Sequence, residues 1–367
     1  MLTVRARLVG ALVLGVALAL PVATRAQAPA ASPTPPVTAP TPDAGKVPPA
    51  PQPTVAPKPA AGSTAVPGWN IPPAWDASSE RPQYASVPGR ETNRLIQGAG
   101  REWREFRNGP MKTLGGWMLV GVLAAILVFY LLRGPLKLHG APTGRMIERL
   151  NAVERVSHWV MAGCFVVLAL SGLVILFGKH LILPWLGYTG FSWLTVISKN
   201  IHNFIGPLFI FSLVVMVLLY VKDNIPAKHD IEWLKKAGGM FGGAEVPSGK
   251  FNAGEKLWFW GGMVVLGTLV SVTGLILDFP NWNQGREAMQ QSSVIHAVAA
   301  LLFVSASFGH IYLGTLGLPG AYSAMATGYV DEQWAKEHHG IWYEEVKQGK
   351  RPEKFVGGAP QPVPGDD

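Results

Sequence analysis

Apolar residues gather in five long runs along the later two thirds of the chain, and shorter segments that hold most of the charges separate them. The runs lie at about 115–133, 156–178, 200–221, 256–277 and 292–315. An α-helix rises about 1.5 Å per residue, so each run is long enough to cross the roughly 30 Å of hydrocarbon in a bilayer. This pattern predicts an all-α membrane protein with five transmembrane helices.

Four histidines interrupt these runs. His158 begins the second run, His202 begins the third, and His296 and His310 both lie on the fifth. If successive spans alternate in direction, His202 and His296 share one depth, and His158 and His310 share another. An ionisable side chain inside a bilayer costs a few kcal/mol and is by default a functional hypothesis. Two imidazoles that face each other can bind a haem iron from both sides. We therefore predict two b haems, ligated by His202/His296 and by His158/His310.

Small residues on the same runs agree with this interpretation, since glycine would admit a flat macrocycle between helices, although close helix packing explains glycine equally well. They are Gly163, Gly172, Gly206, Gly267, Gly274, Gly309 and Gly314. The alternative of another class is a haem-free membrane anchor or transporter, in which the four histidines would relay protons or pack. The remaining histidines are expected on the surface: His139, His180, His229, His338 and His339.

Composition supports a membrane protein and excludes several other classes. The chain has 367 residues, of which 49% are hydrophobic and only 15% are charged. The formal net charge is +8, but the basic residues are spread over loops and segment ends without a basic face, so no nucleic acid partner is expected. Cys164 is the single cysteine, which excludes disulfides, iron–sulfur clusters and covalent C-x-x-C-H haem within this chain.

The N-terminal third has a different organisation. Residues 1–28 combine Arg5 and Arg7 with an apolar run and "AQA", the layout of a signal peptide; an uncleaved anchor is the alternative. Residues 29–68 hold 13 prolines in 40 positions, which predicts a disordered Pro/Ala-rich linker. Residues 69–114 form a juxtamembrane segment with several aromatic residues, which either docks on a partner or is loosely ordered.

A secreted N-terminus gives the spans a direction, and the loop charges test it. The predicted cytoplasmic loops are richer in basic residues than the periplasmic ones, as the positive-inside rule requires. The former hold Lys137, Arg145, Arg149, Arg155, Lys228, Lys235, Lys236 and Lys250, and the latter hold Lys179, Lys199 and Arg286. Arg101, Arg104, Arg107 and Lys112 just outside the first span conflict with the rule. We expect an inner-membrane protein with a periplasmic N-terminal segment and a cytoplasmic C-terminus.

The region 143–346 resembles the gamma subunit of respiratory formate dehydrogenase, the di-haem cytochrome b that anchors that complex in membrane lipid. The motifs "RVSHW", "NIPAKHDIEWL", "FNAGEKLWFW", "VIHAVAA", "GHIYLG" and "QWAKEHHGIWYEEV" carry the resemblance. It implies a four-helix bundle binding two b haems through the same four histidines. The cytochrome b subunits of nickel–iron hydrogenase and thiosulfate reductase are the alternatives. The extra helix at 115–133, everything before it and the tail at 347–367 are not covered.

The resemblance also implies partners and a second site. It implies an iron–sulfur beta subunit and a molybdenum or tungsten catalytic alpha subunit on the periplasmic side, so this chain would transfer electrons and hold no formate-oxidising site of its own. Asn252 and Gly254 match the family positions that meet the quinone, either menaquinone or ubiquinone, beside the cytoplasmic haem. A turn before the helix is the alternative explanation of these two residues.

The predicted orientation can be tested with reporter fusions. A periplasm-active reporter placed between Ala30 and Lys112 should be active, and the same reporter fused after Val356 should be silent, because five spans put the two ends on opposite sides. Activity at the second position would invert the topology.

Overall fold

The computed structural model describes residues 98–240, 246–282 and 284–356. The predicted signal peptide and linker, and most of the juxtamembrane segment, lie outside the described residues. The described residues all belong to one compact unit that begins at Pro72.

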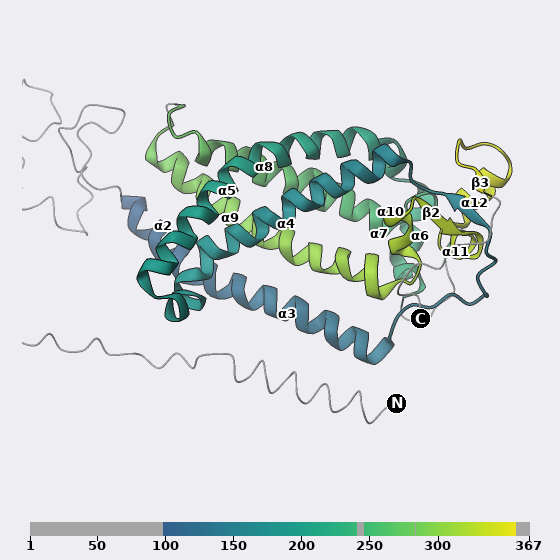
Figure 1. Ribbon diagram of the computed structural model, residues 1–367, viewed down its shortest axis with the longest axis horizontal. Helices are drawn as coiled ribbons and strands as arrows, with labels where there is room; N and C mark the ends of the chain where they lie inside the picture. The colour runs from purple at the N-terminus through teal and green to yellow at the C-terminus, as the bar shows by residue number, and fades with distance from the viewer. Residues whose placement is uncertain (1–97, 241–245, 283, 357–367) are drawn as a thin grey trace, which may run out of the picture. The chain divides into compact units, whose positions relative to one another are not determined.

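Helices dominate this unit (Figure 1). The α-helices are α2 (Gly98–Asn108), α3 (Pro110–Arg133), α4 (Ala152–Leu181), α5 (Leu183–Tyr220), α6 (Lys228–Lys235), α7 (Ala253–Leu257), α8 (Gly267–Asp278), α9 (Arg286–Tyr312), α10 (Ala321–Ala326), α11 (Glu332–His338) and α12 (Gly340–Lys347). Two segments are 3-10 helices, η2 (Val221–Asn224) and η3 (Ala237–Gly239), and two are π-helices, η4 (Trp258–Leu266) and η5 (Leu313–Gly317). The strands are β1 (Met146–Glu148), β2 (Tyr329–Asp331) and β3 (Phe355–Val356).

Five helical runs in the described residues are long and apolar enough to span a membrane, which confirms the predicted number. They extend beyond the apolar runs of the sequence, to residues 100–133, 152–181, 183–224, 253–278 and 286–317. The loop expected at 179–199 is wrong, because α4 continues to Leu181 and α5 begins at Leu183. The chain bends inside α5 at Gly187, whose φ of 65° is open to glycine and strained for other residues.

Polar residues decide where two of the spans begin. Asn151 caps α4 by accepting a hydrogen bond from the Glu154 backbone N–H, and the Glu154 carboxylate accepts one from the Asn151 N–H. Asn252 and Glu255 make the same reciprocal pair at the start of α7. Such a capping box satisfies backbone donors that would otherwise be left unpaired at a helix N-terminus.

The additional helix α3 packs on the outside of the bundle, against α9. Gly115 permits this, because a Cβ there would lie 2.5 Å from a Leu301 methyl group. Only 6% of the apolar window of this span is buried, against 22–33% in the other four spans. The bundle proper is therefore formed by α4, α5, the continuous run α7–η4–α8, and α9.

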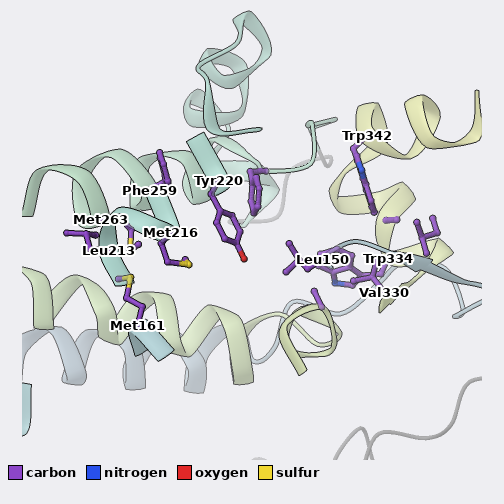
Figure 2. Close-up of a cluster of buried hydrophobic side chains, with 14 of the residues drawn as sticks. Leu150, Met161, Leu213, Met216, Tyr220, Phe259, Met263, Val330, Trp334 and Trp342 are labelled. Carbon is purple, nitrogen blue, oxygen red and sulfur yellow. The ribbon is translucent and has the colours of Figure 1, made fainter. Parts of the chain in front are cut away.

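A small cap closes one end of the bundle, and we define it as β1–β3 with α6 and α10–α12. Its antiparallel sheet has the order β2–β1–β3, with Ile147 opposite Val330 on one side and Phe355 on the other. Trp334 and Trp342 are fully buried there, and the apolar core continues from them past Leu150 and Tyr220 into the bundle (Figure 2). The sheet was not predicted, and β3 shows that part of the expected tail folds back onto β1.

Buried charges join the cap to the bundle. The Lys250 ammonium, with 6% of its side chain exposed, lies 3.1 Å from a Glu154 oxygen, 3.2 Å from Glu353 and 3.5 Å from Asp223. Arg149, equally buried, binds Glu255 at 3.0 Å and donates to the Lys250 carbonyl. These pairs link the start of α4, the loop before α7 and the segment after α12.

His339 corrects a prediction, since it is only 1% exposed and not a surface residue. Its Nδ1 lies 2.8 Å from the Gly249 carbonyl oxygen, and its ring packs beside Trp334. Burial, assisted by the positive charge of Arg149, lowers the pKa of the His339 imidazole to about 3. The residue is therefore a neutral core group of the cap.

The Lys250 cluster generates a stability prediction. Lys250→Met should destabilise the folded protein by about 3 kcal/mol, because three carboxylates would keep their burial and lose their shared cation. The thermal unfolding midpoint of the purified protein in detergent measures the effect. Lys236→Met is the control, since the Lys236–Glu232 pair is exposed and its loss should leave the midpoint unchanged. Equal midpoints for the two variants would contradict the account.

Candidate haem-binding site

The four histidines form two facing pairs within the bundle. The rings of His202 on α5 and His296 on α9 have centroids 6.1 Å apart. The rings of His158 on α4 and His310 on α9 have centroids 6.2 Å apart. We call His202/His296 the hairpin-end pair, after the tight connection between α4 and α5 at that end of the bundle. We call His158/His310, which lies toward the cap, the cap-end pair. The structure thus brings together the pairs that the depth argument predicted.

Both distances suit two imidazoles on opposite sides of one metal ion. A metal–imidazole bond is about 2 Å long and the ring centre lies about 1 Å further on, so trans ligands have centroids about 6 Å apart. No group of three or more His, Cys, Asp or Glu side chains in the described residues could hold a metal by itself. The paired imidazoles are therefore the candidates, and two axial nitrogens without other protein ligands fit haem iron, whose other ligands come from the porphyrin.

Small residues lie one helical turn after every histidine. The position four residues on shares the helix face of the histidine. A Cβ added to Gly206 or Gly314 would meet no atom within 4 Å. These positions are Ala162, Gly206, Ala300 and Gly314. A flat macrocycle beside each pair would thus meet no bulky side chain at these positions.

Two buried hydroxyl groups orient the hairpin-end pair. Ser171 Oγ lies 2.9 Å from His202 Nδ1, and Thr273 Oγ1 lies 3.1 Å from His296 Nδ1. Each hydroxyl donates its single proton to a carbonyl one turn earlier, Ser171 to Val167 at 2.7 Å and Thr273 to Leu269 at 2.5 Å. A metal bound at Nε2 would leave the ring proton of each imidazole on Nδ1, and Nδ1–H would then donate to the hydroxyl oxygen.

A glycine follows each of these hydroxyl residues. A Cβ on Gly172 would lie 3.3 Å from His202 Cε1, and a Cβ on Gly274 would lie 3.3 Å from His296 Cε1. Both contacts are tighter than ordinary van der Waals contact, so any larger side chain would push the imidazole away.

The cap-end pair has different surroundings. The Trp258 ring stacks on His310 with centroids 4.8 Å apart and planes 11° apart. Gly262 makes room for this indole, since a Cβ there would lie 2.6 Å from it. Trp258 begins the π-helical segment η4, and a second such segment, η5, follows His310. His158 Nδ1 is buried and has no hydrogen-bond partner in the part of the chain that the structure describes.

Comparison with known proteins identifies chains that are similar to this one. Residues 149–328 match the family described as prokaryotic cytochrome b561. The nitrate-inducible formate dehydrogenase cytochrome b556(Fdn) subunit of Escherichia coli K12 is 33% identical over 211 residues, which cover 56% of this chain and 94% of the relative. The cytochrome b556(fdo) subunit of the same strain is 31% identical, with 55% and 94% covered, and the formate dehydrogenase cytochrome b556 subunit of Haemophilus influenzae is 30% identical, with 57% and 87% covered.

The chain belongs to the family of formate dehydrogenase cytochrome b subunits. It is a multi-pass membrane cytochrome b, and this family binds haem b.

Asn252 and Gly254, for which the sequence predicts contact with a quinone, lie at the cap end. Asn252 is half-buried, and its Oδ1 is occupied in capping α7, so its Nδ2 is the group left to donate to a ligand. A Cβ on Gly254 would lie 2.8 Å from the Trp233 ring, which explains the glycine by packing. The capped helix leads directly into Trp258, which stacks on His310. Asn252 and Gly254 therefore belong to the same end as the cap-end pair.

Sequence reasoning missed Ser171, Thr273 and Trp258, although an internal repeat in this cytochrome could have shown the first two. "NAVERV" at 151–156 and "NAGEKL" at 252–257 begin two spans, and "SGLVIL" at 171–176 matches "TGLILD" at 273–278. Asn151 precedes Gly172 by 21 positions, and Asn252 precedes Gly274 by 22. The copy that begins at Asn252 contains η4, and a π-helical turn accommodates one extra residue, which accounts for the difference of one position.

Two glycine substitutions test the hairpin-end pair. Gly172→Val and Gly274→Val should each lower the haem bound per purified chain, because the new side chain would displace an imidazole that it already touches at Cβ. Gly121→Val on α3 is the control, since a Cβ there meets nothing within 4 Å. Pyridine haemochrome assay against protein concentration gives the measurement, and wild-type haem content in both Val variants would contradict the assigned geometry.

Proposed function

We propose that this cytochrome carries electrons from an iron–sulfur partner subunit, across the membrane, to a quinone. The observation that carries the proposal is the presence of two facing histidine pairs on one bundle. Both pairs include a residue of α9, and His296 and His310 are separated by 14 positions, or about 21 Å along that helix. Each pair would hold one haem b, which supplies one-electron oxidation and reduction when bound.

The residues of the bundle do the rest. His202 and His296 would hold one haem near one membrane surface, and His158 and His310 would hold the other near the opposite surface. Between them lies an aromatic cluster centred on Phe303, with Phe165 at 4.7 Å and Trp258 at 5.7 Å between ring centroids. Because His296 and His310 lie on the one helix α9, the two pairs would stay at a constant separation.

The partners follow from what the relatives are named. They are cytochrome subunits of formate dehydrogenase, which favours this complex over nickel–iron hydrogenase or thiosulfate reductase. An iron–sulfur beta subunit and a molybdenum or tungsten alpha subunit would supply electrons at the hairpin end, in the periplasm. The cap would then face the cytoplasm, in agreement with the basic loops of the sequence. Arg149 and Lys250 from those loops are buried in ion pairs, so the excess of positive charge on the cytoplasmic side depends on the remaining basic residues of those loops.

The quinone would bind where Asn252 and Gly254 precede Trp258, beside the cap-end pair. The Asn252 amide nitrogen would donate a hydrogen bond to a quinone oxygen. Gly254 would line the same site with its backbone, because the Trp233 ring occupies the place of its side chain. Quinone reduction at this end would take protons from the cytoplasm while the electrons arrive from the periplasm. The cytochrome would then separate charge across the inner membrane.

A substitution series at Asn252 tests the quinone assignment apart from helix capping. Asn252→Ala removes both the amide donor and the cap, and loss of an N-cap costs about 1 kcal/mol. Asn252→Ser keeps a capping oxygen and removes the amide donor. In the intact complex, formate should still reduce the haems in both variants, and stopped-flow reoxidation by added quinone should be slowed strongly in both.

Asn151 supplies the matched control, since it makes the same capping box at the start of α4. Asn151→Ser should reoxidise its haems at the wild-type rate. If Asn252→Ser also behaves as the wild type while Asn252→Ala is slow, Asn252 acts only as a cap and the quinone assignment is wrong. If formate fails to reduce the haems of the wild-type complex, the proposed partner is wrong.

A further inference from the structure

We propose that Ser171 and Thr273 are positioning residues that lower the reduction potential of the hairpin-end haem below that of the cap-end haem. This inference rests on the proposed function, because it takes His202/His296 and His158/His310 as the haem ligands. It concerns the direction of electron flow inside the chain.

Ser171 and Thr273 can each accept a hydrogen bond from the histidine beside them. The Ser171 and Thr273 side chains are 7% and 6% exposed, and each spends its hydroxyl proton on a backbone carbonyl. With Nε2 bound to the haem iron, Nδ1 keeps the ring proton, so each hydroxyl oxygen would accept a hydrogen bond from an imidazole Nδ1–H. An acceptor at Nδ1 fixes the tautomer and ring orientation and makes the metal-bound nitrogen a stronger electron donor.

An acceptor at Nδ1 changes the reduction potential of the haem that the imidazole binds. A more electron-donating axial ligand stabilises the ferric form of haem iron relative to the ferrous form, so the reduction potential falls. At the hairpin end both ligands have such an acceptor, at 2.9 and 3.1 Å.

The cap-end histidines have different neighbours. His158 Nδ1 has no acceptor in the described residues, and His310 contacts the face of Trp258 at 4.8 Å. The internal repeat does not reproduce this pair. The repeat position of His158 is Phe259, seven residues after the capping Asn, and Met216 on α5 stands fourteen residues after His202, as His310 does after His296.

The two sites therefore differ in the hydroxyl acceptors at Nδ1 as well as in the Trp258 ring that stacks on His310, and the hydroxyl acceptors act on the iron in one direction. At the hairpin end, a hydroxyl oxygen lies beside the Nδ1 of both histidines, and the internal repeat supplies both hydroxyl groups. At the cap end, His158 Nδ1 has no such neighbour in the described residues. An electron that enters at the hairpin end would then move to a site of higher potential at the cap end, and return would be uphill.

The experiment is a spectroscopic redox titration of the purified complex and of single variants. Ser171→Ala and Thr273→Val, the latter nearly isosteric, should each raise the lower of the two haem midpoint potentials and leave the higher one unchanged. The expected shift is up to about a tenfold change in the ratio of reduced to oxidised haem at a fixed potential, or about 59 mV for one electron. Ser171→Thr and Thr273→Ser keep a hydroxyl and should retain wild-type potentials.

Low-spin ferric EPR signals of the same samples report ring orientation, and one of the two signals should change in Ser171→Ala and in Thr273→Val. Unchanged potentials, equal shifts of both haems, a shift of only the higher potential, or loss of the haem from both variants would overturn the inference. A wild-type protein without two haems would instead overturn the proposed function beneath it.

Discussion

An imidazole inside a hydrocarbon layer needs a partner for its ring nitrogens, and the arrangement of this bundle follows from that constraint. Four histidines lie on spanning helices, and each faces another across about the distance that a shared metal ion requires. Because α9 supplies one member of each pair, its position relative to α4 and α5 fixes both sites. The small residues one turn after each histidine leave space beside both pairs, and Leu301 of α9 packs closely against Gly115 of α3.

The internal repeat shows how such a bundle can be built from two similar halves. Each half begins with an Asn–Glu capping box, runs to a Ser–Gly or Thr–Gly pair, and receives a histidine from the next helix. The hairpin-end site is thus nearly symmetric. The cap-end site breaks the symmetry, because its histidines stand where the other half has Phe259 and Met216. The π-helical segment η4 brings Trp258 against His310, and the cap and its buried ion pairs cover this end only.

Much of the bundle could be predicted from the sequence, because apolar runs and ionisable interruptions are strong signals in a membrane protein. The number of spans followed from the apolar runs, and the facing of His202 with His296 and of His158 with His310 followed from the depth of these residues. Helix ends did not, since the capping residues Asn151 and Asn252 are polar and lie outside any apolar window. The segment between the second and third apolar runs was expected to be a loop and is largely helical, with a bend at Gly187, because α4 and α5 both continue beyond the apolar runs.

The cap was beyond such reasoning. Its strands are only two or three residues long, so β1 and β3 are too short for a periodic pattern to be recognised in the sequence. His339 looked like a surface residue because nothing in "EHHG" shows that Trp334, Trp342 and the Gly249 carbonyl surround it. Ser171 and Thr273 looked like ordinary small residues of packed helices, and their role depends on a ring from another helix.

Haem stoichiometry is the most direct test of the claim that each histidine pair forms its own site. The wild-type protein should contain two haems per chain, both removable by acid–acetone because neither is covalently attached. His296→Ala and His310→Ala should each retain one haem, with different absorption maxima because the remaining haem is a different one, and the double variant should retain none. A wild-type content of no haem or one haem, or the same residual spectrum in both single variants, would contradict the account.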